Sequence, residues 1–276
     1  AGYIMTWGSN VPLTRTPDAH FLTEVRYKGT KVVSVSPDYA ESTTSSDAWL
    51  NVKAGTDAAL AMSMGHVILK EYYIDKETPY FKEYAKEFTD MPFLVRVEDI
   101  NGTVQPGRFL NAKDLGRQEE GADFQMVLID ELTNEIVVPN GTMGERHTNP
   151  QKWNLRLENR DTGAKIDPRL SVFDQREDVT VVKLPYFGDE EHEGVIERAI
   201  PTITVQTVDG PVKVTTVYDL ILANYGIDRG IGGEVATAYT DDTPYTPTWQ
   251  EKITGVKADI AIATAREFAD NAEKTK

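Results

Sequence analysis

Two short polar turns follow the first two apolar runs of the sequence, and their residue types suit a phosphate and a sugar or base. Gly8-Ser9-Asn10 comes directly after the run at 3–7, and Ser36-Pro37-Asp38 follows the run at 31–35. Small residues let backbone N–H groups approach an anion. An acidic residue after the second strand of a nucleotide-binding fold often accepts a hydrogen bond from a sugar or base hydroxyl or amine. The chain has no G-x-G-x-x-G motif. The alternative is therefore an ordinary turn, with Asp38 capping a helix or solvated.

A third polar turn, Gly55-Thr56-Asp57, opens a predicted helix. Thr56 suits the N-cap and Asp57 the first turn, where a carboxylate interacts favourably with the helix dipole, so capping alone is the favoured interpretation. The other possibility is that Asp57 accepts hydrogen bonds from a guanine edge. The N1–H and N2–H₂ donors of guanine lie side by side and match one carboxylate.

Alternating strands and helices are predicted over the first third of the chain. Thr16-Pro17 is typical of a helix start, and Gly29 suits the end of that helix. A third strand is expected at 49–52, before a largely apolar helix that continues to about residue 74. This order favours right-handed crossovers and a Rossmann-like parallel sheet with flanking helices, a fold of the α/β class. The polar turns then share the carboxyl edge of the sheet, where ligands of such sheets bind.

The remainder of the sequence changes character twice. Residues 93–214 are predicted to form an irregular β-rich insertion, with strand-like runs at 93–97, 135–138 and 202–205. Residues 215–276 return to helix, with starts at Thr216 and Thr246-Pro247 and a third helix over 258–271. The expected organisation is a nucleotide-binding βαβ region at 1–92, the insertion at 93–214 and C-terminal helices at 215–276.

Three pairs in the insertion are typical of hairpin turns, namely Asn101-Gly102, Asn140-Gly141 and Asp209-Gly210. The first two also begin Asn-Gly-Thr glycosylation sequons. The turn is the favoured interpretation, because these residue types tolerate the positive φ that a tight hairpin needs.

Composition excludes several classes of function. The 276 residues carry a formal net charge of −15, which argues against a broad contact surface for nucleic acid or anionic lipid. The chain has no cysteine, so it supplies no disulfide, thiolate nucleophile or iron–sulfur ligand. Its histidines lack metal-ligand spacing, and no stretch approaches the ~20 apolar residues that cross a bilayer.

Because neither end resembles that of a complete gene product, we expect an internal fragment of a longer protein.

The order of the three turns resembles the molybdopterin-guanine-dinucleotide oxidoreductases of the dimethyl sulfoxide reductase family. That family has a Gly-Ser-Asn-type loop after a strand, a second strand-end loop that usually contains Asp-Pro-Arg, an Ala-Asp before the third strand, and Pro-Gly-Thr-Asp before a helix. Here Ser36-Pro37-Asp38 stands at the second loop, Asp47-Ala48 precedes the third strand, and Ala54-Gly55-Thr56-Asp57 precedes the helix.

Longer stretches narrow the resemblance to the large catalytic subunits of respiratory nitrate reductases. The similarity spans nearly the whole chain and is carried by long ordered runs, although the insertion matches loosely. These runs are 7–12, 14–21, 24–31, 84–94, 215–225 and 245–272.

The resemblance implies reduction of nitrate to nitrite at a molybdenum held by two molybdopterin guanine dinucleotides, in a full subunit that also carries an iron–sulfur cluster. It implies as partners the remainder of the catalytic subunit, an iron–sulfur beta subunit and a membrane cytochrome b subunit that oxidises quinol. The complex would be membrane-associated through those partners, on the cytoplasmic face. In the family the molybdenum ligand and the cysteine-rich segment precede the matching region, so no catalytic or metal-binding residue is assigned here.

The same motif match implies a role for each turn. Gly8, Ser9 and Asn10 would lie near a diphosphate or pterin. The second turn would border ribose and guanine through Ser36, Pro37, Asp38 and Tyr39. The guanine pocket would be completed by Gly55, Thr56 and Asp57. Such binding supplies orientation and electrostatics, whereas the oxygen-atom chemistry belongs to the cofactor.

Several other residues favour structural roles. His20 and His66 fall in predicted helices, where packing or surface positions are expected, and Trp249 and Phe268 are expected in the core. For the acidic run at 189–193 a solvated loop is favoured over a cation site. Arg15, near the first turn, is an alternative phosphate contact.

Two other functions are considered. One keeps the family but replaces nitrate with chlorate, perchlorate, selenate or a hydrocarbon. The other is a nucleotide-binding or scaffold module without redox chemistry. We expect the isolated chain to be inactive and to retain the cofactor weakly or not at all.

Overall fold

A computed structural model describes residues 1–141, 156–186 and 194–274. The chain divides into two compact units. Unit 1 comprises Ala1–Lys76 with Ala236–Lys276, and unit 2 comprises Glu77–Val235. The acidic run at 189–193 and the Thr142 of the second sequon lie outside the described residues.

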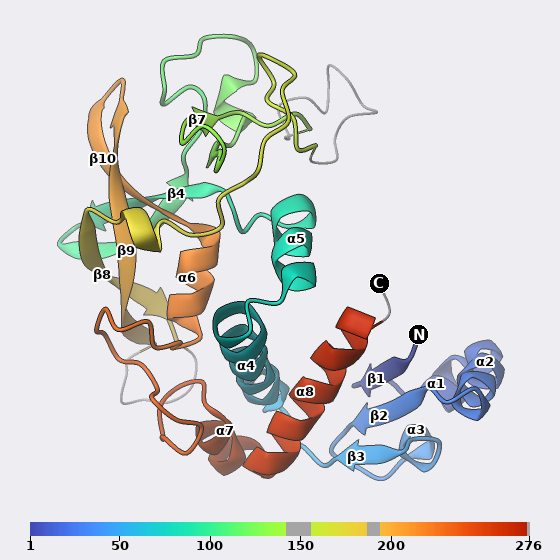
Figure 1. Cartoon of the computed structure of the whole chain (residues 1–276). Helices are drawn as coiled ribbons and strands as arrows, with labels where there is room; N and C mark the ends of the chain where they lie inside the picture. Colours follow the sequence, from blue (N-terminus) through green and yellow to red (C-terminus); the bar gives the residue numbers. More distant parts are fainter. Residues whose placement is uncertain (142–155, 187–193, 275–276) are drawn as a thin grey trace. The chain divides into compact units, whose positions relative to one another are not determined.

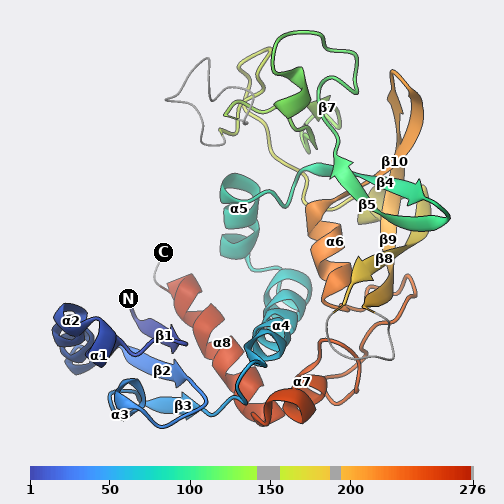
Figure 2. The ribbon, with the colours of Figure 1, turned by 180° about the vertical axis from the view of Figure 1, so that it is seen from behind.

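Unit 1 contains a three-stranded parallel sheet in the order β1-β2-β3 (Figures 1 and 2). Its strands are β1 (Tyr3–Trp7), β2 (Lys31–Val35) and β3 (Ala48–Leu50). Trp7 pairs with Val35, and Val35 pairs with Leu50. The three strands therefore end level with one another, and the predicted α/β fold with a parallel sheet is confirmed.

The helices that the sequence predicts in unit 1 begin at the expected residues, whereas the short helices α1 and α3 were not predicted. Thr16-Pro17 starts α2, Thr246-Pro247 starts α7, and Gly29 follows the end of α2 with φ +91°. The long apolar helix keeps α-helical geometry only to Ile68 and continues as a π-helical segment, η1. The helical elements of unit 1 are α1 (Val11–Thr14), α2 (Thr16–Tyr27), α3 (Glu41–Thr44), α4 (Asp57–Ile68), η1 (Leu69–Asp75), α7 (Pro247–Thr254) and α8 (Ala258–Lys274).

The core of unit 1 lies between the sheet, α4 and α8. Most of its aliphatic side chains come from β2, β3 and α4, with Val52 and Val256 from loops, whereas α8 contributes Ala261 and Ala265. Trp249 is buried, as predicted. The prediction that Phe268 lies in the core is wrong, because small residues line the buried face of α8. Phe268 is 44% exposed and contacts the ring of Tyr3 edge-on at 5.9 Å.

Unit 2 is built on a five-stranded antiparallel sheet in the order β5-β4-β10-β9-β8. The sheet curls so that β5 also approaches β8. Asn101 and Gly102 form the β4–β5 turn with φ 57° and 81°, as their residue types predict. This half of the insertion is more regular than expected. The strands are β4 (Leu94–Ile100), β5 (Thr103–Phe109), β8 (Asp178–Pro185), β9 (Val195–Thr207) and β10 (Gly210–Thr216).

The other elements of unit 2 are short. Thr216 caps α6, which packs against β9 and β10, by accepting a hydrogen bond from the Asp219 N–H at 3.1 Å. The described residues between β5 and β8 are largely irregular, as predicted. The remaining elements are α5 (Pro79–Phe88), η2 (Ala122–Phe124), β6 (Leu128–Ile129), β7 (Ile136–Val137), η5 (Phe173–Gln175) and α6 (Val217–Asn224).

Two features that would bear on function are absent from the described residues. No helix in this part of the chain combines the length and the apolar character that a membrane span requires. Within the same residues, no group of three or more acidic or histidine side chains is arranged to hold a metal ion.

Candidate functional site

The two turns that follow β1 and β2 lie side by side at the carboxyl edge of the parallel sheet. The Gly8 N–H donates to the carbonyl of Val35 at 3.2 Å, and the Ser36 N–H donates to the carbonyl of Leu50 at 3.2 Å. Gly8 adopts φ +61°, a left-handed conformation that favours glycine. These bonds fasten each turn to the end of the next strand.

Asn10 presents an unpaired acceptor in the first turn. Its Nδ2 donates to Oε2 of Glu41 at 2.7 Å, and this hydrogen bond lowers the pKa of Glu41 from its ordinary value. An ionised carboxylate only accepts, so the amide must turn its NH₂ toward Glu41 and its oxygen away. That Oδ1 atom is buried without a partner among the described residues. A buried polar atom left unpaired costs roughly 1–3 kcal/mol, so Asn10 is suited to accept from a ligand.

Backbone donors accompany this acceptor. Ser9 and Asn10 donate their N–H groups to no acceptor in the described part of the chain. Gly8 leaves space beside them, since a Cβ placed on it would meet nothing within 4 Å. The first turn thus offers N–H donors and one amide oxygen to a phosphate-bearing ligand.

The second turn is fixed by its own hydroxyl and by a tryptophan of β3. Ser36 Oγ donates to the Asp38 carbonyl at 2.5 Å, and Trp49 Nε1 donates to the Ser36 carbonyl at 2.9 Å. The Tyr39 ring meets Trp49 edge-on at 5.3 Å and is 65% exposed. Pro37 and Asp38 are also exposed. Asp38 caps no helix, because Ala40 occupies the N-cap of α3. Its exposed carboxylate receives a long hydrogen bond from Ser36 Oγ at 3.4 Å, on Oδ1.

The third turn is held by a tryptophan of β1. Trp7 Nε1 donates to Oδ1 of Asp57 at 2.8 Å, which fixes the carboxylate at the start of α4. Thr56 occupies the N-cap, but its hydroxyl donates to the Lys53 carbonyl at 2.7 Å and does not cap the helix. Thr56 and Asp57 thus occupy the N-cap and the first turn, as predicted, although Thr56 forms no capping hydrogen bond. No hydrogen bond from the described residues reaches Asp57 Oδ2, which leaves one oxygen available.

All three predicted turns lie in unit 1, at strand ends or at the start of α4 (Figures 1 and 2). Sequence reasoning missed the residues that hold them, which are Trp7, Glu41 and Trp49. A signal existed for Trp7, because it directly precedes Gly8. Glu41 gave no signal, since its role depends on the placement of α3 beside Asn10.

The other candidate residues have structural contacts. His66 is 1% exposed on α4 and meets the Tyr239 ring edge-on at 5.9 Å, as a packing residue should. His20 is exposed and lies 3.9 Å from the Glu24 carboxylate. Arg15 lies 3.9 Å from Asp18 with 69% of its side chain exposed, so no described contact directs it toward the first turn.

The arrangement combines N–H donors, an unpaired amide oxygen, two carboxylates and an exposed aromatic ring. Donors of this kind suit a phosphate, and the carboxylates suit the N–H groups of a base or the hydroxyls of a sugar. The predicted residues provide no nucleophile activated by a neighbouring base. The chemistry that this edge supports is binding of a nucleotide-like group.

Comparison with known proteins shows the family to which the chain belongs. The chain is 51% identical over 275 residues to the nitrate reductase alpha chain of Bacillus subtilis (strain 168), and 47% identical over 288 residues to the respiratory nitrate reductase 1 alpha chain of Escherichia coli (strain K12). Both alignments cover 100% of this chain but only 22% and 23% of those relatives. The perchlorate reductase subunit alpha of Dechloromonas aromatica (strain RCB) is 40% identical over 144 residues, which are 52% of this chain and 14% of that protein.

The chain thus spans less than a quarter of the length of the first two relatives. The family model for molybdopterin oxidoreductases matches residues 1–261, which is nearly all of the sequence. On this evidence the chain belongs to the molybdopterin oxidoreductase family.

Proposed function

We propose that this chain is the part of a respiratory nitrate reductase catalytic subunit that binds the nucleotide end of a molybdopterin guanine dinucleotide. The family implies a molybdopterin cofactor. The observation that carries the guanine dinucleotide form is the meeting of three polar turns at one sheet edge, where Trp7 holds Asp57 and Glu41 orients Asn10. This set matches the parts of a guanosine diphosphate, which are an anion, a sugar and a base with two adjacent donors.

Each turn has a separate task in this proposal. The N–H groups of Ser9 and Asn10 bind the diphosphate or the adjoining pterin, beside Gly8. Asp38 and Tyr39, with Ser36 and Pro37, border ribose and guanine. Asp57, placed by Gly55 and Thr56, accepts hydrogen bonds from the guanine edge through Oδ2, because Trp7 already donates to Oδ1. These side chains orient the cofactor and exclude water from its nucleotide end.

When bound, the molybdenum centre supplies the oxygen-atom transfer that reduces nitrate to nitrite. The residues of this chain hold the cofactor and take no part in that step. Having no cysteine, the chain provides no iron–sulfur ligand, so in this proposal the cluster belongs to the rest of the subunit. The molybdenum ligand is assigned to the rest of the subunit by the family resemblance. An iron–sulfur beta subunit and a membrane cytochrome b subunit, on the cytoplasmic face, complete the complex.

Nitrate is the proposed substrate because the relatives that align with the whole chain are named nitrate reductases. Perchlorate is a second candidate, since a perchlorate reductase aligns with about half of the chain. The residues of the three turns lie at the nucleotide end of the cofactor, so the choice between oxyanions requires an assay.

The test uses a longer polypeptide that carries this sequence, expressed with its partner subunits. Molybdenum and guanine content are measured, and oxidation of reduced viologen is followed with nitrate, chlorate, selenate or perchlorate. We expect molybdenum, guanine nucleotide and nitrate-dependent oxidation. A protein without molybdenum contradicts the enzymatic proposal, and one with molybdenum that prefers perchlorate favours the second candidate.

The isolated chain gives a separate result. It holds only part of the surface that such a large cofactor contacts, so we expect weak retention or none after purification. Pterin at one equivalent in the purified chain contradicts this expectation.

A further inference from the structure

Strand β9 is longer than its neighbour β8, and this difference leaves part of one edge of β9 unpaired. The β8–β9 ladder ends at the pair Asp178↔Thr202. Beyond it, residues 203–207 of β9 pair only with β10, on the other side. Thr207 and Gly210 close a two-residue turn, and in such hairpins the closing residues exchange hydrogen bonds.

This register fixes which groups face the unpaired side. Bonding alternates along an antiparallel ladder, so Thr207, Val205 and Ile203 bond to β10. Thr204 and Gln206 turn their N–H and C=O groups the other way. The pairing of Gln206 with Pro211 fits, because proline has no N–H to donate at a bonded position.

Most of the groups on this side have no partner. The Thr204 N–H donates to Oε2 of Glu177 at 3.0 Å. In the described part of the chain, no hydrogen bond reaches the N–H of Gln206 or the carbonyls of Thr204 and Gln206 from this side. Both residues are exposed. Such an edge is a ready template for another strand.

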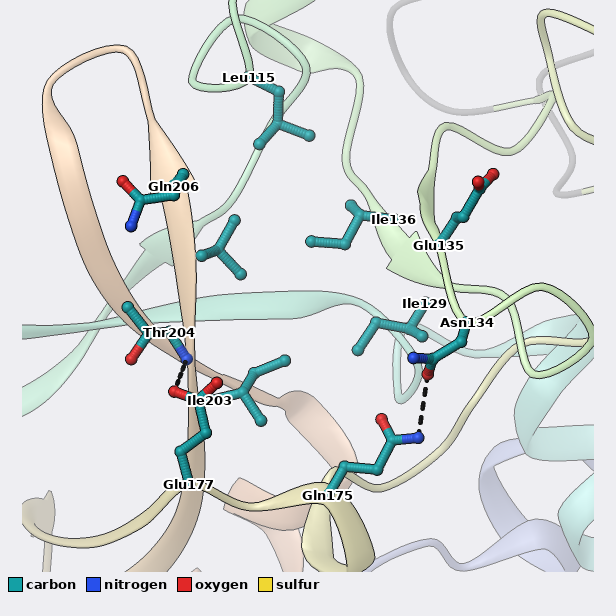
Figure 3. Close-up of a pocket in the computed structure, with 11 residues that line it drawn as sticks. Leu115, Ile129, Asn134, Glu135, Ile136, Gln175, Glu177, Ile203, Thr204 and Gln206 are labelled. Carbon is teal, nitrogen blue, oxygen red and sulfur yellow. Dashed lines mark hydrogen bonds between the residues drawn. The ribbon is translucent and has the colours of Figure 1, made fainter.

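A groove of about 860 Å³ runs beside this edge. Figure 3 shows Ile203 on one wall and Ile129 and Ile136 of the β6–β7 hairpin opposite, with their side chains pointing into the same space. The aliphatic residues that line it are Leu115, Ile129, Ile136, Ile203 and Val205. Its charged lining consists of Glu135 and Glu177, without a lysine or arginine.

We propose that the groove binds an extended segment of a partner polypeptide, added as a strand to residues 203–207 of β9. Backbone groups of Gln206 and Thr204 supply the hydrogen bonds, and alternate side chains of the segment enter the apolar groove. The segment carries valine- or isoleucine-like residues on its inner side and lysine or arginine on its outer side, near Glu135 and Glu177. This interaction is independent of the nucleotide site, which lies in unit 1.

A partner is favoured over a second copy of this chain on grounds of charge. A second copy would bring its own Glu135 and Glu177 to the same place, and each chain carries a formal net charge of −15. Like charges that face each other across paired strands are destabilising. A segment that carries lysine or arginine would instead be attracted to Glu135 and Glu177.

The probe is a fluorescein-labelled peptide of seven alternating valines and lysines, titrated with the 276-residue chain and followed by anisotropy. We expect saturable binding. N-methylation of the amides along one edge of the peptide should weaken it about tenfold or more, because it removes backbone donors and leaves the charge unchanged. An N-methylated peptide that binds equally well overturns the proposal, and so does the absence of binding.

A matched pair of variants tests the edge of β9 itself. Gln206→Ala keeps the N–H and should bind the peptide like the parent. Gln206→Pro removes only an N–H that β10 does not use, and should weaken binding about tenfold. Near-ultraviolet circular dichroism verifies that both variants fold. Glu135→Lys should also weaken binding. Equal peptide affinities of the alanine and proline variants would overturn the assignment to a partner segment. Self-association of the parent chain in sedimentation, if Gln206→Pro abolishes it, would also overturn that assignment.

Discussion

The indole N–H of Trp7 donates to Oδ1 of Asp57 across 2.8 Å, and this bond joins the last residue of β1 to the first residue of α4. Trp7 directly precedes Gly8, so the same residue anchors the first and third turns. The bond uses one carboxylate oxygen of Asp57 and leaves Oδ2 without a hydrogen bond from the described residues. It is the most direct structural connection between two predicted parts of the site.

Replacing Trp7 with phenylalanine should loosen this connection while keeping most of the ring packing. Loss of one hydrogen bond is expected to lower the free energy of unfolding by about 1 kcal/mol, and to weaken GDP binding because Asp57 is no longer held. Urea unfolding and calorimetric titration with GDP measure the two effects. Tyr27→Phe is the control, since Tyr27 is 88% exposed. A loss of stability without a change in GDP affinity would show that the bond is structural only.

Asp57→Asn separates recognition of guanine from folding. The asparagine oxygen can still accept from Trp7, but its NH₂ then faces the donor groups of guanine. GDP affinity should fall about tenfold, since a site built for hydrogen bonds discriminates strongly when a partner is wrong, whereas ADP affinity should not change. Asp18→Asn, on exposed α2, is the matched control. Parallel losses for both nucleotides would argue against a guanine-specific contact.

Gly8→Ala tests whether the first turn depends on its left-handed backbone. Gly8 has φ +61° and open space around it, so the cost arises from the backbone alone and should be about 1–2 kcal/mol. GDP binding should weaken as well, because the N–H groups of Ser9 and Asn10 would be displaced. Gly29→Ala, at φ +91° after α2, should lose comparable stability and leave nucleotide binding intact. Identical nucleotide affinities for both variants would contradict the assigned role of the turn.

Asp114 gives a prediction for pH dependence in unit 2. It is 5% exposed and accepts from Arg108 Nη1 at 2.7 Å and from the Asn111 N–H at 3.1 Å. Burial alone would raise the pKa of Asp114, but these hydrogen bonds hold it below its ordinary value. A depressed folded-state pKa adds stability above the unfolded value of about 3.9, and this stability is lost as pH falls through the folded pKa.

Asp114→Asn should therefore destabilise the protein at neutral pH by about 2 kcal/mol, because it removes the charge from a buried carboxylate that accepts hydrogen bonds from Arg108. The variant should also lose less stability than the parent on acidification below pH ~4. Urea unfolding from pH 7 to 3 measures both effects, with the exposed Asp123→Asn as control. If the free energy of unfolding falls equally steeply with pH in the variant and the parent, the Asp114 carboxylate is not the source of the pH dependence.

Local signals predicted the elements of unit 1 well. Threonine–proline pairs start α2 and α7 where the sequence places them, and the apolar runs at 3–7 and 31–35 coincide with β1 and β2. The curled sheet of unit 2 could not be predicted in this way. Its register depends on pairs between distant segments, such as Val214↔Arg96. The buried face of α8 was also misjudged, because close packing selected alanines over Phe268.

The candidate site was also predictable only in part. Motif order indicated all three turns, because glycine, asparagine and aspartate directly after apolar runs are typical of the points where strands end and helices begin. The contacts that fix the turns were not predictable. Glu41 reaches Asn10 only because α3 folds beside the first turn, and the Thr56 hydroxyl bonds backward to Lys53. The first contact depends on tertiary placement, and the second on the local backbone conformation of the turn, and neither follows from residue type and spacing.

Amide chemical shifts can establish whether the three turns form one site for a guanosine diphosphate group. The chain is titrated with GDP and, separately, with ADP, while the backbone resonances of Gly8, Asn10, Tyr39 and Asp57 are followed. We expect all four resonances to shift together with one dissociation constant for GDP, and with a weaker one for ADP. Shifts confined to a single turn, or equal responses to both nucleotides, would contradict it.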